Sequence, residues 1–158
     1  MGKERKNEEQ YKRQDERLGL LIWFRLSRIY NQSLRASNQY LKAWDLTVAQ
    51  FDCLVQIGSH EGLTQQELAD KLFVTKGNIT QLLSKMEQLG WITRQQTWKT
   101  KHLYLSEQGR KLFDEVVPKQ EHYQASHFDT LNLEEKKQLI ALLRKVESAS
   151  LEQEKDKS

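Results

Sequence analysis

The segment from Leu63 to Trp91, LTQQELADKLFVTKGNITQLLSKMEQLGW, is the feature of this chain that most narrows its fold. It predicts two short helices joined by a tight turn. Thr64 and Glu67 have the spacing of a capping box, in which the hydroxyl and the carboxylate each accept a backbone N–H at the start of a helix. Thr75 can cap a second helix, and Gly90 stands where a glycine commonly ends one.

The second of these helices has one apolar face and one unusual polar face. Its apolar side chains recur at helical spacing and predict a buried stripe: Ile79, Leu82, Leu83, Met86 and Leu89. The residues facing away from that stripe include no acid: Lys76, Gly77, Asn78, Thr80, Gln81, Ser84, Lys85 and Gln88. A solvated helix usually favours an acid in its first turn, by about 0.3–1 kcal/mol. Lys76 in that turn therefore indicates a docked polyanion, with an ordinary polar helix face as the alternative.

Length and composition limit the classes of protein to consider. A chain of 158 residues fits one domain, or one domain with arms used for assembly. Only 37% of its residues are hydrophobic, so it is either a well-solvated helical protein or one that buries surface against a partner. The net charge of +3 is small, so any affinity for anions must come from where the basic residues lie. One cysteine excludes an internal disulfide and favours a reducing cytosol.

The N-terminal part of the chain divides into a charged arm and a long helix. Residues 1–17 mix both signs of charge and predict a frayed helix start or a disordered arm, with a nucleic-acid-binding tail as the alternative. Residues 18–44 predict one helix with apolar side chains nearly all round: Leu18, Leu20, Leu21, Ile22, Trp23, Phe24, Leu26 and Ile29. Such a helix is buried on more than one side. A second subunit is the simplest cover. The apolar run is too short for a membrane span, and no signal peptide precedes it, so we expect a cytoplasmic protein.

The next helix carries the chain's one cysteine. Thr47 and Gln50 predict its capping box, and its core face ends near Gly58. Cys53 lies beside Phe51 on that face, where a thiol usually serves as a small buried hydrophobic group. No basic residue nearby in sequence would lower its pKa. A redox-responsive role for Cys53 remains the alternative.

A basic hairpin is expected after the helix-turn-helix. Residues 91–95 and 101–105 alternate as paired strands do, and residues 96–100 form the tip between them. No acid interrupts the segment between Gly90 and Ser106. A basic, extended tip beside such helices suits a minor groove or the phosphate backbone. The predicted contacts are Arg94, Trp98, Lys99 and Lys101, although Trp98 could instead fold back onto the domain.

The C-terminal part predicts further helices. Ser106 caps the first, and Pro118 should kink or restart it, because proline removes a backbone donor and clashes with the preceding turn. Asn132 and Glu135 open the last helix, in which apolar residues again recur at helical spacing. The tail from Leu151 is charged and is expected to fray.

Taken together, these motifs and their order resemble the MarR family of winged helix-turn-helix regulators. The resemblance rests on the segments at residues 46–51, 63–91 and 105–110 and covers roughly residues 18–147. It implies a mainly α fold with a small β-hairpin wing (α+β). The implied division is a charged arm at 1–17, an N-terminal dimerisation helix at 18–44, a winged helix-turn-helix domain at 45–106, C-terminal dimerisation helices at 107–150 and a charged tail at 151–158.

The resemblance also implies a function. Family members are homodimers that bind double-stranded DNA, which here would place the helix from Lys76 in the major groove and the hairpin from Arg94 to Lys101 in the minor groove. The major-groove contacts implied are Lys76, Gly77, Asn78, Thr80, Gln81, Ser84 and Lys85, with Asn78, Thr80, Gln81 and Lys85 near base edges and Lys76 and Ser84 at phosphates, as are Arg94, Lys99 and Lys101 of the hairpin. We therefore expect a repressor that reads a pseudo-palindromic operator. Many relatives are released by small aromatic effectors, and the residues that could line such a pocket are Trp23, Tyr30, Tyr40 and Trp44. Plain core packing of these aromatic residues is the alternative. In the wing, Thr97-Trp98-Lys99 stands where the family usually has an acid before an arginine.

Two other classes of function fit the sequence less well. A winged helix can serve as a protein–protein interaction module, but the acid-free helix face favours DNA. An enzyme is not expected, because the chain has no phosphate-binding glycine loop and no HExxH motif. The histidines lack metal-ligand spacing, with one another or with Cys53: His60, His102, His122 and His127. We accordingly expect no cofactor and no bound metal.

Overall fold

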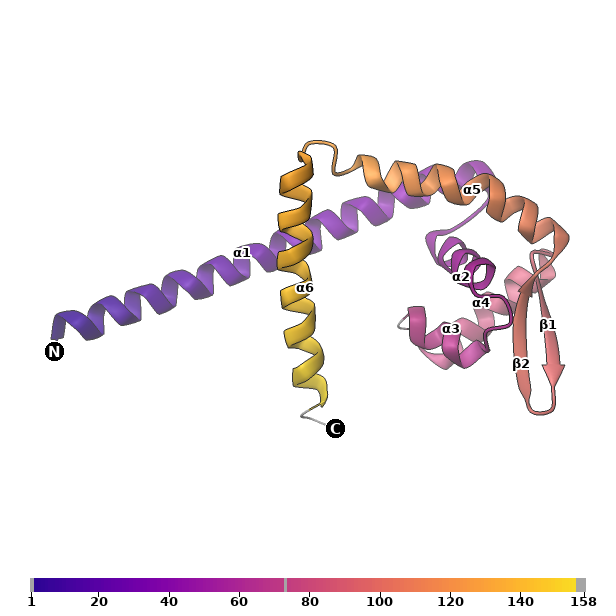
Figure 1. Cartoon of the computed structure of the whole chain (residues 1–158), viewed down its shortest axis with the longest axis horizontal. Helices are drawn as coiled ribbons and strands as arrows, with labels where there is room; N and C mark the ends of the chain where they lie inside the picture. The colour runs from indigo at the N-terminus through magenta and orange to yellow at the C-terminus, as the bar shows by residue number, and fades with distance from the viewer. Residues whose placement is uncertain (1, 73, 156–158) are drawn as a thin grey trace. The chain divides into compact units, whose positions relative to one another are not determined.

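The computed structural model describes residues 2–72 and 74–155, and the side chains of residues 9–72, 74, 75 and 77–149. In these residues the chain is mainly helical, with a two-stranded antiparallel hairpin (Figure 1). The elements are α1 (Gly2–Leu41), η1 (Lys42–Trp44), α2 (Val48–Ser59), α3 (Gln65–Leu72), α4 (Lys76–Gln88), β1 (Ile92–Thr97), β2 (Thr100–Leu105), α5 (Glu107–Ser126) and α6 (Leu133–Lys155). They form two compact units, Met1–Gln120 and Glu121–Ser158.

Helix α1 is longer at its start than the sequence predicts. It begins at Gly2, so the segment expected to be a frayed helix start or a disordered arm continues the helix. The reason lies in composition, since residues 3–17 hold no proline, glycine or β-branched residue and are rich in good helix formers. At its other end, α1 stops at Leu41 instead of Trp44. A short 3-10 turn follows, and Asp45 ends it with a left-handed φ of 55°.

The core of the first unit is built around α2. The predicted capping box is confirmed: the Gln50 N–H donates to Thr47 Oγ1 over 3.2 Å, and the Thr47 N–H donates to Gln50 Oε1 over 2.9 Å. The expected core face is buried, with Leu54 and Ile57 fully excluded from solvent. The C-terminal end of α1 is attached to this helix, because Asn38 Oδ1 accepts from the Val48 N–H over 3.0 Å.

Helices α3 and α4 confirm the predicted helix-turn-helix. The Thr64 N–H donates to Glu67 Oε2 over 2.7 Å, and Thr64 Oγ1 accepts from the Glu67 N–H over 3.2 Å. Thr75 Oγ1 accepts from the Asn78 N–H at the start of α4, as expected. At the end of α4, Gly90 has a φ of 74°.

The residues after α4 close it with a Schellman motif. The Gly90 N–H donates to the Glu87 carbonyl, and the Trp91 N–H donates to the Met86 carbonyl, each over 3.0 Å. This pair of hydrogen bonds satisfies carbonyls that the last turn of a helix otherwise leaves without partners. The turn requires a left-handed residue, which explains the glycine at position 90.

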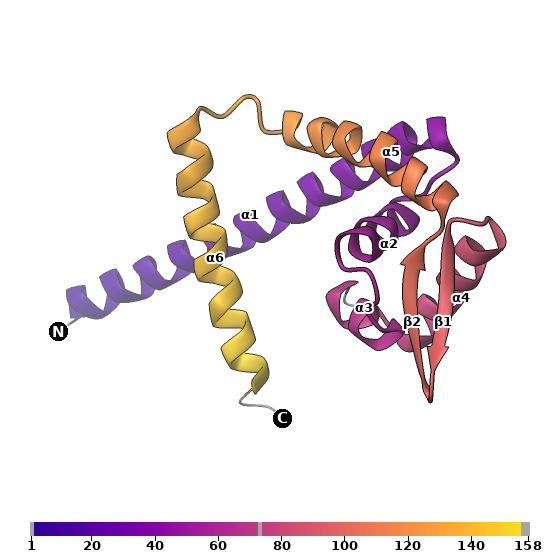
Figure 2. The same cartoon turned by 45° about the vertical axis from the view of Figure 1, so that its right-hand side comes forward.

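The hairpin is longer and its turn tighter than the sequence predicts. The ladder runs from Ile92 opposite Leu105 to Thr97 opposite Thr100, so that only Trp98 and Lys99 form the tip. Trp98 has a positive φ of 59°. Figures 1 and 2 show the two strands as a narrow ribbon beside α2–α4. The segment before α3 also pairs with β2, since the Leu103 N–H donates to the Leu63 carbonyl over 2.9 Å. This pairing was not predicted.

The hairpin and α5 meet at a small joint around Ser106. Its hydroxyl donates to the Gly90 carbonyl and accepts from the Gly109 N–H, while its own N–H donates to the Trp91 carbonyl. The predicted cap is therefore confirmed, and it also fastens the start of α5 to the end of α4.

The predicted restart at Pro118 is wrong, because α5 is one continuous helix. Pro118 is exposed, while Val116, Val117 and Gln120 on the other side are buried. Burial of the apolar Val116 and Val117 offsets the loss of one backbone hydrogen bond, whose freed carbonyl belongs to the exposed Asp114.

The second unit contains the end of α5 and helix α6. The predicted start of α6 at Asn132 and Glu135 is confirmed, and the two residues form a capping box: the Asn132 N–H donates to Glu135 Oε2 over 2.8 Å, and Asn132 Oδ1 accepts from the Glu135 N–H over 3.0 Å. Between the two helices lies an apolar hollow lined by Ala125, Phe128, Leu131, Lys136, Leu139, Ile140 and Leu143. Over the described residues, every helix is too short or too polar to cross a bilayer.

Candidate nucleic-acid interface

Helix α4 turns its apolar stripe inward and its acid-free residues outward. Ile79, Leu83 and Met86 are fully buried. On the other side, the described side chains of Asn78, Gln81 and Lys85 are exposed. These three carry the amide and ammonium groups that the sequence assigned to base edges, and in this structure they are accessible.

The first turn of α4 is open and lacks an acidic side chain. A Cβ built on Gly77 would have no atom within 4 Å, so the backbone there can be approached closely. Exposed N–H groups at a helix N-terminus favour an anion, because the helix dipole adds partial positive charge. The side chain of Lys76 lies outside the part that the structure describes, so its predicted phosphate contact stays a prediction.

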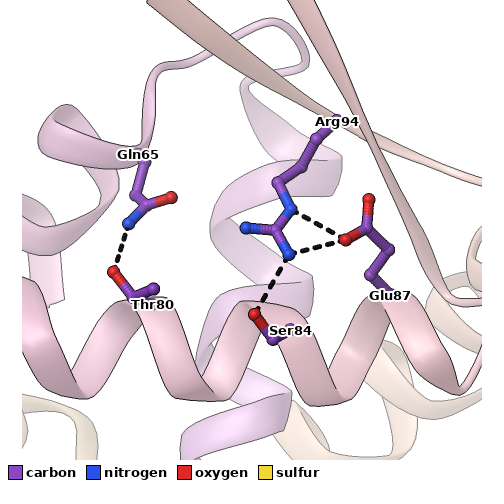
Figure 3. A network of polar contacts seen from close by, with 5 residues as sticks. All are labelled: Gln65, Thr80, Ser84, Glu87 and Arg94. Carbon is purple, nitrogen blue, oxygen red and sulfur yellow. Dashed lines mark hydrogen bonds and ion pairs between the residues drawn. The ribbon is translucent and has the colours of Figure 1, made fainter.

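Two hydroxyls of the predicted contact set already have partners within the protein. Gln65 Nε2 on α3 donates to Thr80 Oγ1 over 2.6 Å, and Arg94 Nη2 on β1 donates to Ser84 Oγ over 3.1 Å (Figure 3). Thr80 and Ser84 therefore connect α4 to its neighbours. Their predicted contacts with DNA remain untested.

Arg94 lies against α4 and is held by a carboxylate. Its Nε and Nη2 donate to Glu87 Oε2 over 2.9 and 2.6 Å, and its side chain is only 15% exposed (Figure 3). Glu87 was missed in the sequence analysis, which described this face of α4 as free of acids. The sequence did hold a signal for this ion pair, because Glu87 and Arg94 carry opposite charges and lie on either side of the turn at Gly90. The ion pair offsets the charge of Glu87.

The tip of the wing is fully accessible. Trp98 is 92% exposed, which contradicts the alternative that it folds back onto the domain. Gln96 Nε2 donates to the Trp98 carbonyl over 3.0 Å and so ties the strand to the tip. Lys99 and Lys101 are both exposed. The tip thus presents one large aromatic ring and one ammonium group, and Lys101 on β2 adds a second ammonium group next to the tip.

The four aromatic residues proposed for an effector pocket do not surround one cavity within a protomer. Tyr40 and Trp44 contact each other, with ring centroids 5.5 Å apart. Tyr30 and Trp23 are exposed on α1 and lie about 15 and 25 Å from Tyr40 along the helix axis, at about 1.5 Å per residue.

Trp44 itself is engaged by α5. Its indole N–H donates to Glu115 Oε1 over 2.9 Å, and the Lys119 ammonium lies 5.3 Å from the ring centroid. The hydrogen bond from Trp44 is the first cause of a lowered pKa for Glu115. These contacts match the alternative of structural packing for Trp44.

Cys53 is deeply buried and weakly acidic. Its exposed fraction is 0%, and burial, together with the charge of neighbouring Asp52, raises its pKa to about 12. The thiolate, which is the reactive form, is therefore scarce at neutral pH. This geometry speaks against the redox alternative. Among the described residues, no three His, Cys, Asp or Glu side chains lie together as a metal site.

Comparison with known proteins identifies a family. The profile described as "MarR family" matches residues 44–97. An uncharacterized HTH-type transcriptional regulator of Bacillus cereus (strain ATCC 10987 / NRS 248) is 48% identical over 141 residues, which cover 89% of this chain and 96% of the relative. The transcriptional repressor MprA of Escherichia coli (strain K12) is 30% identical over 128 residues, covering 78% of this chain and 73% of MprA.

A solved structure agrees with these sequence relatives. The crystal structure of an S. aureus MepR–DNA complex superimposes with a TM-score of 0.74 at 26% identity, covering 80% of this chain and 95% of MepR. The helix-turn-helix, the wing and the similar proteins all indicate the same family. The chain belongs to the MarR family of winged helix-turn-helix, DNA-binding transcriptional regulators.

Proposed function

We propose that this regulator is a homodimeric repressor that reads a pseudo-palindromic operator, with α4 in the major groove and the wing in the adjacent minor groove. The observation that carries the proposal is the exposed face of α4, where Asn78, Gln81 and Lys85 offer donors and acceptors without a carboxylate among them. MepR, which has the same fold, was crystallised with DNA. Two such helices related by a two-fold axis fit half-sites about one helical turn apart.

The dimer is inferred from apolar surface that one protomer leaves exposed. On α1 the exposed large hydrophobic residues are Leu18, Leu20, Leu21, Ile22, Trp23, Phe24, Leu26, Ile29 and Tyr30. On α6 they are Leu133, Ile140, Leu142, Leu143 and Val146. Apolar residues gathered along a helix in this way mark an interface more often than a solvated surface. A second copy of the chain covers them most simply, and closed two-fold dimers are the commonest oligomers.

The predicted contacts divide into two kinds. Asn78, Gln81 and Lys85 would face base edges, where amide and ammonium groups can distinguish base pairs. Lys99 and Lys101 would approach phosphates, with Trp98 beside them at the minor groove. Gly77 allows the backbone of α4 to come close to the sugar–phosphate chain. Lys76 belongs to the same phosphate set by its position in the first turn.

Repression is proposed because an operator occupied in this way excludes polymerase, and because the relative MprA is named a transcriptional repressor. Release by a small aromatic molecule would act by population shift, changing the spacing of the two recognition helices. The Tyr40–Trp44 pair is the part of the predicted pocket that the fold brings together.

The test is selection of bound sites from random duplexes, followed by affinity measurements over a range of salt. A pseudo-palindromic consensus and a steep fall of affinity with salt would support the proposal, because neutralised phosphates release counterions. Sedimentation of the free protein tests the dimer. Failure to bind any duplex at low ionic strength would overturn the proposal and favour a protein–protein interaction module.

A further inference from the structure

The exposed half of α4 is divided into two rows of side chains with different surroundings. At about 3.6 residues per turn, Thr80, Ser84 and Glu87 fall on one row, and Gln81, Lys85 and Gln88 fall on the next. Every member of the first row contacts a neighbouring element. Thr80 accepts a hydrogen bond from Gln65 of α3, while Ser84 and Glu87 each accept one from Arg94 of β1 (Figure 3). The second row is exposed.

Arg94 is placed poorly for a phosphate contact and well for an internal one. Its side chain is 15% exposed, and two of its nitrogens point at Glu87 and Ser84 (Figure 3). The guanidinium is planar and its donors are fixed in a fork, so a group held by two partners on one helix has its orientation set. The neighbouring carboxylate would also repel a phosphate at this position.

The position of Arg94 in the hairpin means that these contacts affect the direction of the whole wing. It lies in the middle of β1, opposite Leu103 of β2, which is fully buried. From Arg94 the ribbon continues three residues to Thr97 and then the tip, where Trp98 and Lys99 are exposed. A contact between the middle of the ribbon and α4 therefore fixes the direction in which the tip points.

We propose that Arg94, Ser84 and Glu87 form a latch that sets the angle of the wing against α4, and that Arg94 is a positioning residue for DNA binding instead of a phosphate ligand. The inference rests on the proposed function, since it concerns how α4 and the wing reach DNA together. In this arrangement Glu87 promotes binding to a polyanion despite its negative charge. The latch can therefore be tested by whether removal of this negative charge weakens or strengthens DNA binding.

The experiment compares Arg94→Met, Glu87→Gln and the double variant in two measurements. The first is amide hydrogen exchange of residues 92–105 in the free protein, which does not depend on DNA. The second is affinity for a selected operator at several salt concentrations. Arg94→Met keeps most of the aliphatic stem, and Glu87→Gln keeps the shape of the side chain, so both variants are expected to fold.

The latch predicts faster exchange in the wing for both single variants. It also predicts weaker operator binding for both, by about 10-fold, although one variant removes a positive charge and the other a negative charge. The double variant should be no weaker than Arg94→Met alone. The slope of log affinity against log salt should stay as in the parent for Arg94→Met, because no phosphate contact is lost.

A matched ion pair provides the control. Arg110 donates to Glu61 in the same compact unit, with both side chains about 40% exposed, and neither lies on α4 or the wing. Arg110→Met and Glu61→Gln should leave the exchange of residues 92–105 and the operator affinity within about twofold of the parent.

Several results would overturn the latch. Unchanged exchange in the wing of both variants would do so, whatever the DNA measurements give. Tighter binding by Glu87→Gln would show that the carboxylate acts only by repulsion. A salt slope smaller by about 1 for Arg94→Met would identify Arg94 as a phosphate ligand. If the parent binds no duplex, the proposed function fails, and the exchange measurement still decides whether the latch exists.

Discussion

Gly109 faces the carbonyl oxygen of Trp91, and a Cβ built at this position would lie 1.8 Å from that oxygen. Since real Cβ atoms do not approach a backbone oxygen so closely, the first turn of α5 could accept a side chain here only by moving away from Trp91. The glycine is required by this close approach of two backbones and not by its φ.

Replacement of Gly109 by alanine should therefore destabilise the fold. We expect Gly109→Ala to lower the free energy of unfolding by about 3 kcal/mol, because the clash involves backbone that cannot rotate away. Denaturant unfolding would measure the change. Gly77→Ala is the control, since its Cβ would meet nothing within 4 Å, and it should stabilise the helix by up to about 1 kcal/mol. Equal stability of Gly109→Ala and the parent would show that α5 is not tightly held.

Glu67 is a second residue whose environment leads to a measurable effect. The Thr64 backbone and hydroxyl are the first causes that lower the pKa of Glu67 from its usual value of 4.5. A carboxylate with a lowered pKa in the folded state contributes stability that is present above 4.5 and is lost as the pH falls through the folded-state pKa.

Glu67→Gln should consequently have a cost in stability that depends on pH. The difference in unfolding free energy between parent and variant should be largest near neutral pH and should shrink as the pH falls below 4.5. Thermal unfolding between pH 3 and pH 7, a range spanning that value, would measure it. Gln65→Ala, on the same helix, removes a hydrogen bond to the uncharged Thr80 hydroxyl and should show a difference that is constant over this range. A gap that widens in acid would contradict the capping role of Glu67.

At the scale of elements, the sequence predicted those features that depend on neighbours along the chain. The capping boxes at Thr47 and Thr64, the helix start at Asn132, the Gly90 stop and the apolar stripe of α4 are local, and all are confirmed. The restart at Pro118 was wrong because burial on the opposite face of α5 outweighs a local breaker. Pairing of Leu63 with β2 joins segments 40 residues apart, and no local pattern signals it.

In the candidate site, too, local features could be predicted from the sequence and contacts between distant residues could not. The outward face of α4 followed from helical periodicity, so Asn78, Gln81 and Lys85 could be predicted. The partners of Thr80, Ser84 and Arg94 could not, because a list of polar residues does not tell which of them bond to each other. Side chains that look equivalent in sequence are separated only by the packing of α3 and β1 against α4.

Gln81 and Lys99 should affect DNA binding in different ways. Gln81→Ala should relax base preference at one position by about 1–3 kcal/mol, whereas Lys99→Ala should weaken binding to all sequences and reduce the salt slope by about 1. Competition binding with single-base operator variants would separate the two. Lys111→Ala, which removes a lysine paired with Glu107 on α5, serves as the control for charge. If Gln81→Ala weakened every sequence equally, Gln81 would not be a base reader.

At the scale of the whole molecule, the proposed dimer accounts for the low hydrophobic content of the chain. Its 37% of hydrophobic residues supply one core around α2–α4, and several more remain exposed on α1 and α6. In the proposed dimer, these exposed residues would be buried only after association. Its measured stability should therefore depend on concentration.

A charge placed on the apolar face of α6 should separate the subunits. Leu142 is 63% exposed in the protomer, and Leu142→Glu should shift sedimentation toward the monomer and weaken operator binding, since a single half-site contact remains. Ala141→Glu is the matched control, because Ala141 is also exposed and, at about 100° per residue, points away from the apolar face that holds Leu142. Full retention of the dimer by Leu142→Glu would place the interface elsewhere.

The joint around Ser106 has a mechanical consequence. Its hydrogen bonds with Gly90, Trp91 and Gly109 connect the end of α4, the base of the β1–β2 hairpin and the first turn of α5. The close approach of the Gly109 backbone to Trp91 packs these segments tightly against one another. A shift of the first turn of α5 would then carry the end of α4 and the base of the hairpin with it. In the proposed repressor, an effector that moved the start of α5 would therefore move the recognition helix and the base of the wing together.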